Sequence, residues 1–257
     1  MSDLISIITT LYNYKQYICD LIESVLKQTH TNWELIIVDD ASTDNPIDVI
    51  KPYLKDKRIK YIRFSKNKGY SVAKNEGIIA SQGEYIVMID ADDILTEKSL
   101  EVRYNLLKSN PDKLWCHGEA FVTNITGQMR SESSRKWKQN FRKQISKEID
   151  LTKTYHHRLI HAQGVMLRKD LHRKIGLYDE KLRCSSDNEM WRRAIKFGHV
   201  PAYTNEFVSI YRVHSARMSR SEWKNKIRRE VKSYIINVVE RRFKEGINKF
   251  NTRLLGT

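Results

Sequence analysis

An apolar run that ends abruptly in carboxylates constrains the fold of this chain more than any other segment. Residues 83–93 read GEYIVMIDADD, so that Asp90, Asp92 and Asp93 directly follow a stretch of Tyr, Ile, Val and Met. Such a continuous apolar run is typical of a strand that is buried on both faces of a parallel sheet. Open α/β sheets bind ligands at the carboxyl ends of their strands, which is where these acids would lie.

The crowded carboxylates allow two interpretations. Three acids within four residues repel one another unless a cation neutralises them, and hard divalent cations bind oxygen ligands and bridge to substrate phosphates. The alternative is an ordinary acidic helix start after a strand, because Asp favours N-cap positions. We expect Asp93 to cap the following helix in either case.

The first hundred residues alternate between expected strands and expected helices. This repetition predicts a parallel sheet with right-handed crossovers. The expected elements are a strand over 6–13 that breaks into a polar loop, a helix over 17–28, a strand over 33–44 ending in acids, a strand over 58–64, and a helix opened by 68–77.

The second half is less regular. Residues 128–155 are polar, basic and poorly periodic, and we interpret them as an acceptor-side insertion. The expected elements are a helix over 97–109, strands over 114–123 and 164–167, a helix over 168–175 ended by Gly176, a helix over 186–197 capped by Ser186 or Asp187, one or two strands over 200–213, and an amphipathic helix with a basic face over 221–244.

Length and composition favour one large cytosolic α/β domain. The 257 residues suffice for a sizeable core, and no run approaches the roughly 18 apolar residues of a membrane span. The first expected strand begins so early that we expect no signal peptide. Three distant cysteines, Cys19, Cys116 and Cys184, form neither a metal-binding pattern nor a disulfide framework.

The positive charge is concentrated in two segments. Residues 127–158 hold nine Lys or Arg and three Asp or Glu, which gives +6, and residues 217–253 hold twelve and four, which gives +8. These segments account for nearly all of the formal net charge of +15. Such a bias suggests a surface for an anionic partner, and the alternative is a merely solvated basic surface.

Four short motifs occur in a fixed order along the first half. Together they closely resemble family 2 glycosyltransferases, strongly over residues 4–96 and more weakly over 164–219. The family usually has Pro where this chain has Thr10. The motifs are Leu11-Tyr12-Asn13, Val38-Asp39-Asp40-Ala41-Ser42-Thr43-Asp44, Ala73-Lys74-Asn75-Glu76-Gly77 and Asp90-Ala91-Asp92-Asp93.

The resemblance implies a GT-A fold, which is a Rossmann-like, mostly parallel sheet flanked by helices. It divides the expected domain, residues 1–219, into a nucleotide-sugar-binding half over 1–110 and an acceptor and catalytic-base half over 111–219. The smaller acceptor-side region lies in the second half. Residues 220–257 are expected to form a basic C-terminal extension that contains the amphipathic helix.

By the same resemblance, Thr10, Tyr12 and Asp40 hold the uracil and ribose of the donor. Tyr12 can stack on a flat base, or it can cover the core at a strand end. Asp40 can accept a base N–H, or it can satisfy backbone N–H groups of a turn, while Asp39 is the structural member of the pair. Lys74 stands where the family often has Arg beside the nucleotide, and a solvated helix lysine is an equally good interpretation.

The resemblance also assigns the metal and the base. Asp92 is then the direct ligand of Mn²⁺ or Mg²⁺, and Asp90 faces the ribose or a metal-bound water. His214, in the segment Tyr211-Arg212-Val213-His214-Ser215, binds the metal or the diphosphate, or it is a satisfied surface histidine. Asp187 matches the family's catalytic base, and its alternative is a helix cap without catalytic function.

Acceptor contacts are less defined. Trp191 could floor the acceptor sugar or belong to the core, and His161 could line the acceptor cleft. We interpret His156 and His157 as loop residues, because they have no carboxylate partner at zinc-site spacing.

These assignments predict a cytoplasmic inverting glycosyltransferase that uses a UDP-sugar. The expected acceptor is a glycan or a lipid-linked precursor of lipopolysaccharide or capsule. The basic C-terminal helix would bring the enzyme to the inner face of an anionic membrane. Two alternatives remain open, a glycosyltransferase acting on nucleic acid such as modified phage DNA bases, and a non-catalytic nucleotide-sugar-binding protein.

Overall fold

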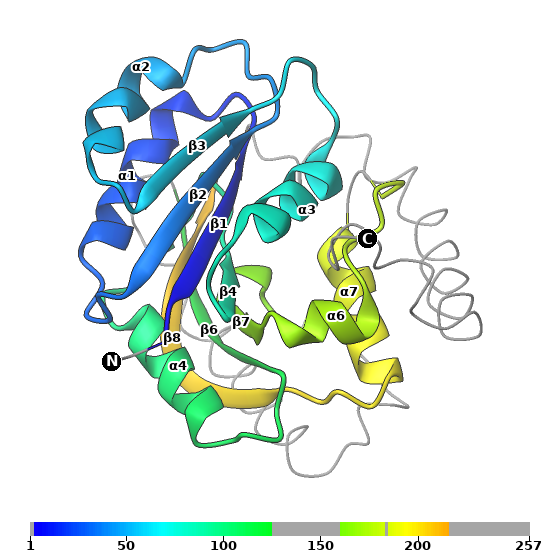
Figure 1. The fold of residues 1–257 in the computed structure, drawn as a ribbon. Coiled ribbons are helices and arrows are strands. Elements are labelled where there is room, and N and C mark those ends of the chain that lie inside the picture. Colours follow the sequence, from blue (N-terminus) through cyan, green and yellow to red (C-terminus); the bar gives the residue numbers. More distant parts are fainter. Residues whose placement is uncertain (1–2, 125–159, 183–184, 216–257) are drawn as a thin grey trace.

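An eight-stranded mixed sheet forms the centre of the computed structural model, which describes residues 3–124, 160–182 and 185–215 (Figure 1). The strands are β1 Ile5–Leu11, β2 Trp33–Asp39, β3 Ile59–Arg63, β4 Tyr85–Met88, β5 Ile94–Leu95, β6 Trp115–Asn124, β7 Val165–Arg168 and β8 Ala202–Val213. The helices are α1 Lys15–Leu26, α2 Ile47–Ile50, α3 Tyr70–Ala80, α4 Ser99–Lys108, α6 Asp170–Ile175 and α7 Ser186–Lys196, with 3-10 turns η1 Lys51–Lys55 and η2 Ala162–Gly164.

The first half of the sheet is parallel, as the sequence predicts. The strand order is β3-β2-β1-β4-β7-β6-β8-β5, and β1 pairs in parallel with both β2 and β4 while β2 pairs in parallel with β3. Every residue of β2 and β4 is buried, which explains their near-continuous apolar sequences. The carboxyl ends of β1, β2 and β4 therefore meet at one edge of the sheet.

The second half of the sheet departs from the parallel pattern. β7 runs antiparallel to both β4 and β6, and β5 runs antiparallel to β8, whereas β6 and β8 are parallel. The two-residue strand β5 has no counterpart among the sequence predictions, because it is too short to show a period. The antiparallel strands bring residues after 160 next to the carboxylates that follow β4.

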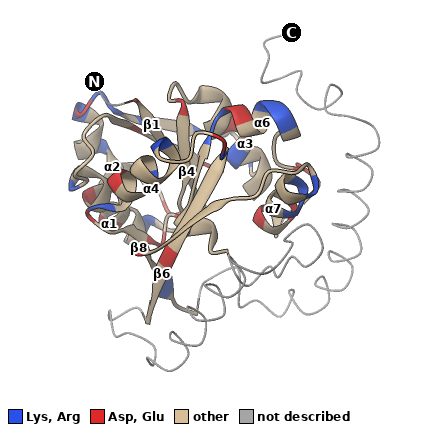
Figure 2. Ribbon diagram, turned by 90° about the horizontal axis from the view of Figure 1, so that it is seen from below, with Lys and Arg blue, Asp and Glu red and all other residues tan. Residues whose placement is uncertain are grey.

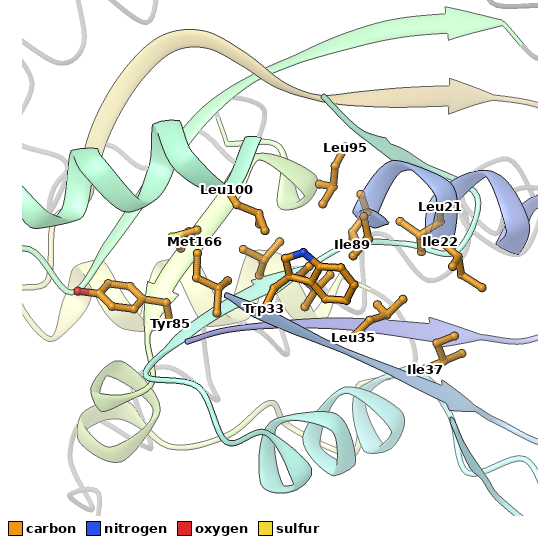
Figure 3. Close-up of a cluster of buried hydrophobic side chains, with 14 of the residues drawn as sticks. Leu21, Ile22, Trp33, Leu35, Ile37, Tyr85, Ile89, Leu95, Leu100 and Met166 are labelled. Carbon is orange, nitrogen blue, oxygen red and sulfur yellow. The ribbon is translucent and has the colours of Figure 1, made fainter. Parts of the chain in front are cut away.

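Two apolar layers hold helices on both faces of the sheet (Figure 1). One layer packs α1 and α4 against the sheet through residues such as Ile22 and Leu100, and it encloses Trp33, which is 2% exposed (Figure 3). The other packs α3, α6 and α7 through residues such as Ile78 and Met190. The predicted helices over 17–28, 97–109, 168–175 and 186–197 are confirmed, with ends that shift by no more than two residues.

Charge is balanced over the described part of the chain. Its Lys and Arg equal its Asp and Glu in number, because the +15 falls on residues 125–159 (+6), 183–184 (+1) and 216–257 (+8). Figure 2 shows both signs interspersed on the described helices. The predicted insertion over 128–155 and the predicted basic helix over 221–244 lie outside the described residues. Among the described helices, none combines the length and the apolar character needed to cross a membrane.

Candidate active site

Three carboxylates gather where β4 ends. Ligand oxygens of Asp90, Asp92 and Asp93 lie within 4.8 Å of one another, and Asp92 and Asp93 are buried. The loop that carries them follows the carboxyl end of β4, beside the ends of β1 and β2. The sequence prediction of a carboxylate cluster at this edge is therefore confirmed.

The two oxygens of Asp90 are held by groups from two different segments. The Tyr70 hydroxyl, at the start of α3, donates to Oδ1 over 2.6 Å, and Gln163 Nε2, in η2, donates to Oδ2 over 2.8 Å. Burial, reinforced by the negative charges of Asp90 and Asp187, raises the pKa of Tyr70 well above its ordinary value, so Tyr70 stays a donor. Gln163 was not predicted from the sequence, because a single glutamine in a short turn carries no signal.

Asp92 contacts a histidine from the far end of the described chain. His214 Nε2 lies 2.9 Å from Asp92 Oδ2, and the two residues are 122 positions apart. The His214 side chain is 4% exposed, and the rings of Tyr14 and Tyr17 pack against it. His214 is therefore a buried residue, and its alternative interpretation as a surface histidine is wrong.

Arg212 fixes the loop that carries the carboxylates. Its backbone N–H donates to Asp93 Oδ1 over 2.9 Å, its Nε donates to the Asp92 carbonyl over 2.5 Å, and its Nη1 forms an ion pair with Asp20. The prediction that Asp93 caps the next helix is wrong, because this carboxylate faces β8 and α4 starts six residues later at Ser99. The signal for Arg212 was its place beside His214 in the segment 211–215.

The pair of Asp92 and His214 offers a carboxylate oxygen and an imidazole nitrogen, two groups that can bind a divalent cation. Asp92 Oδ2 and His214 Nε2 lie 2.9 Å apart, at hydrogen-bond distance, and Asp92 belongs to the group of Asp90, Asp92 and Asp93 whose oxygens are close enough together to hold a metal ion. Carboxylate oxygen suits Mg²⁺ or Mn²⁺, and a site with few protein ligands leaves positions for phosphate oxygens and water. The residues present therefore fit such a cation.

The ends of β1 and β2 carry the residues predicted to hold the nucleotide. Thr10 is half-buried at the end of β1, and Tyr12 follows with 46% of its surface exposed, so its ring is open to a ligand. Asp40 is 4% exposed, and its carboxylate accepts the backbone N–H groups of Lys68 over 2.6 Å and Gly69 over 2.8 Å. This geometry supports the turn-stabilising alternative for Asp40.

Asp39 is the structural member of its pair, as predicted. It is fully buried, Oδ1 accepts the Ser42 N–H over 2.8 Å, and Oδ2 accepts Arg63 Nη1 over 2.8 Å and the Tyr61 hydroxyl over 2.5 Å. Burial and the bond to Asp39 raise the pKa of Tyr61 to about 12. These bonds tie the end of β2 to β3 and shape the loop that follows.

Asp187 lies in the first turn of α7 and forms an ion pair with α3. Lys74 Nζ is 2.5 Å from Asp187 Oδ1, and the Tyr178 hydroxyl donates to the same oxygen over 3.3 Å. Lys74 is buried, so its interpretation as a solvated helix lysine is wrong. The predicted cap by Ser186 or Asp187 is also wrong, because the N-cap is Ser185 in a left-handed conformation (φ 59°) without a side-chain cap bond.

The two residues predicted to contact an acceptor differ in position. Trp191 is 2% exposed and stacks on Trp115 with ring centroids 4.9 Å apart, so of its two interpretations the structure supports the core one. The indole offers no open face for a sugar. His161 is half-buried next to η2, where its ring contacts Tyr211. His156 and His157 lie outside the described residues.

Solved structures share this fold. TarS of S. aureus in complex with UDP matches 83% of this chain and 61% of its own chain with a TM-score of 0.63 at 18% identity. The mannosyltransferase PcManGT of Pyrobaculum calidifontis, in complex with GDP-Man and Mn²⁺, matches 89% and 61% with a TM-score of 0.65 at 16% identity. The expected GT-A architecture is therefore confirmed.

Sequence comparison identifies the family. The model of glycosyl transferase family 2 matches residues 6–176, so this chain belongs to that family. TuaG of Bacillus subtilis, whose name assigns it to teichuronic acid biosynthesis, is 43% identical over 99 residues. That match covers 38% of this chain and 39% of TuaG, and the chain thus spans about two-fifths of this relative.

Proposed function

We propose that this glycosyltransferase moves a sugar from a UDP-sugar to an acceptor hydroxyl with inversion of configuration, and that Mn²⁺ or Mg²⁺ assists the reaction. The observation that carries the proposal is the 2.9 Å pair of Asp92 and His214 beside Asp90 and Asp93. Tyr12, which directly follows β1 and is 46% exposed, is proposed to supply a surface for the nucleotide base at the same carboxyl-end edge of the sheet.

The ligands of the solved structures of similar fold support a nucleoside diphosphate sugar as the donor. TarS was solved with UDP and with UDP-GlcNAc, and PcManGT with GDP-Man and Mn²⁺. We propose UDP for this chain, held by Thr10, Tyr12 and the loop that Asp40 organises. In this proposal Asp40 acts mainly by fixing the backbone at Lys68 and Gly69, where the nucleotide would lie.

Asp92 and His214 would hold the cation, which neutralises the diphosphate and stabilises it as a leaving group. Asp187 is the proposed general base. One Asp187 oxygen takes the proton of the acceptor hydroxyl while the oxygen of that hydroxyl attacks the anomeric carbon. The bond from the anomeric carbon to the diphosphate oxygen breaks as the new glycosidic bond forms. A single displacement of this kind inverts the anomeric configuration.

The proposed pathway is the synthesis of a cell-surface polysaccharide. The name of TuaG supports it, and so does the charge of +8 over residues 217–253, which suits a location near anionic lipid and a lipid-linked acceptor. We therefore propose a peripheral position on the cytoplasmic face of a membrane, with residues 220–257 as the contact.

Nucleotide release from candidate donors tests the reaction without a known acceptor, because water can take the place of the acceptor hydroxyl. A thermal-shift screen with UDP-GlcNAc, UDP-glucose and GDP-mannose in Mn²⁺ selects the donor, and the rate of nucleotide release is then measured in Mn²⁺ and in EDTA. NMR of the released sugar identifies the anomer that forms first, before mutarotation. The proposal predicts metal-dependent release and the inverted anomer. Full activity in EDTA, with metal shown to be absent, contradicts the metal role, and a retained anomer contradicts inversion.

A further inference from the structure

We propose that Lys74 is a positioning residue for the base Asp187 and not a ligand of the donor. The inference rests on the proposed function, in which Asp187 takes the acceptor proton. The family resemblance implied a position beside the nucleotide for Lys74, with a solvated helix lysine as the alternative, but its ammonium points to α7. Lys74 Nζ lies 2.5 Å from Asp187 Oδ1, across 113 positions of sequence.

The lysine is enclosed on all the sides that the structure describes. Its side chain is 3% exposed, whereas that of Asp187 is 20% exposed. The Tyr70 ring lies 4.0 Å from Nζ and the Tyr178 ring 4.8 Å, so the ammonium sits between two aromatic faces. A group that binds a diphosphate needs access to it, and the more accessible member of this pair is the carboxylate.

Tyr178, one of the partners of Lys74, is itself fixed to α3. Asn75 Nδ2 donates to the Tyr178 carbonyl over 3.0 Å, and the Tyr178 N–H donates to Asn75 Oδ1 over 2.9 Å. These two hydrogen bonds between the Asn75 side chain and the Tyr178 backbone hold Tyr178 at a set distance from the helix. Lys74 and Tyr178 therefore contact Asp187 from a common support, the helix α3.

Both donors bind the same oxygen of Asp187. Because Lys74 Nζ and the Tyr178 hydroxyl occupy Oδ1, the carboxylate rotamer is fixed and Oδ2 is the oxygen left for the acceptor proton. Burial and the nearby Asp187 charge raise the pKa of Tyr178 well above its ordinary value, so its hydroxyl remains a donor. Asp187 thus has one oriented oxygen, Oδ2, that can take the proton.

The same unit reaches the donor side of the site. Tyr70, which forms one wall around Lys74, donates to Asp90 over 2.6 Å. One turn of α3 therefore carries both a contact to the carboxylates and the contact to the base. The distance between the leaving group and the proton acceptor is then set by α3, which is the requirement for in-line displacement.

Separate measurements of donor affinity and turnover test this role. The variants are Lys74→Met, which removes the charge, Lys74→Arg, which keeps it, and Tyr178→Phe, which removes only the second donor to Asp187. Isothermal titration with UDP and Mn²⁺ gives Kd, and nucleotide release from the donor selected above gives kcat. Lys169→Met is the matched control, because it removes a half-buried lysine that donates to the Ser81 carbonyl, away from the carboxylates.

The inference predicts that Lys74→Met lowers kcat about a hundredfold, because misplacing a catalytic group by an ångström costs about that much. The Kd for UDP stays within threefold, Lys74→Arg recovers part of kcat, and Lys169→Met changes neither. Tyr178→Phe lowers kcat several-fold with Kd unchanged, and this variant decides the matter if Lys74→Met does not fold.

A loss of UDP affinity that parallels the loss of kcat in Lys74→Met overturns the inference and makes Lys74 a donor ligand. Unchanged kcat in both Lys74→Met and Tyr178→Phe also overturns it. Failure of the proposed function looks different, because the unmodified protein would then neither bind UDP in Mn²⁺ nor release nucleotide.

Discussion

Asp187→Asn separates the proton-accepting role of this side chain from its place in the fold. Asparagine has the same size, and its carbonyl oxygen can still accept from Lys74 and Tyr178, as Oδ1 does here. The second oxygen becomes an amide nitrogen, which cannot take a proton. The variant therefore keeps the geometry around α7 and removes the base.

The expected loss of turnover is about a hundred- to ten-thousand-fold, the usual contribution of a general base. This corresponds to roughly 3–5 kcal/mol in the activation barrier. Stability should fall as well, because the buried Lys74 exchanges a charged partner for a neutral one. Charge-assisted hydrogen bonds are about twice as strong as neutral ones, so we expect a loss of about 1–2 kcal/mol in the free energy of unfolding.

Three measurements on the same preparations check this prediction. Nucleotide release gives turnover, isothermal titration gives the UDP affinity in Mn²⁺, and urea denaturation gives the free energy of unfolding. Asp170→Asn is the control, since it removes a carboxylate from the first turn of the neighbouring α6. Turnover equal to that of the unmodified protein refutes the assignment of the base. A UDP affinity that falls as far as turnover would instead show a structural role.

Three further predictions concern stability and membrane contact. Burial lowers the pKa of His172 to about 3, so below about pH 6.5 the unfolded chain binds a proton that the folded chain does not. The free energy of unfolding should therefore be about 2 kcal/mol lower at pH 5 than at neutral pH, and urea titrations of His172→Asn should show a weaker pH dependence. Gly77→Ala should destabilise by about 1–3 kcal/mol, because the new Cβ would lie 2.3 Å from Ile8 Cγ2, and in urea denaturation the penalty should vanish in an Ile8→Ala background. A variant with Gln in place of five basic residues of the predicted C-terminal helix should release the protein from vesicles that contain anionic lipid at moderate salt, without loss of nucleotide release; undiminished vesicle binding contradicts the membrane role, and a positive DNA gel shift would favour a nucleic-acid acceptor. These five residues are Arg228, Arg229, Lys232, Arg241 and Arg242.

The first half of the fold followed from local pattern. The runs that end at Asp39 and at Asp90 are apolar because β2 and β4 are buried on both faces, and a parallel sheet then requires their carboxyl ends to meet. The strand β5 and the antiparallel course of β7 were not predicted, because short strands have no period from which direction can be read.

The candidate site shows the same limit at the level of side chains. The family resemblance indicated Asp92 and His214, but the sequence could not show that Lys74 faces Asp187, since that contact depends on how α7 packs on α3. Trp191 is the converse case: its helical position was predicted, and only the packing against Trp115 shows that it belongs to the core.

Titration of UDP into the protein in the presence and absence of Mn²⁺ tests the central claim most directly. If Asp92 and His214 hold a cation that binds the diphosphate, heat of binding should be measurable in Mn²⁺ and should disappear in EDTA. The UDP affinity in Mn²⁺ should fall at least tenfold in His214→Asn. Equal UDP affinity in Mn²⁺ and in EDTA, or an unaltered affinity in both His214→Asn and Asp92→Asn, would contradict the claim that this pair forms a metal site for a nucleotide-sugar donor.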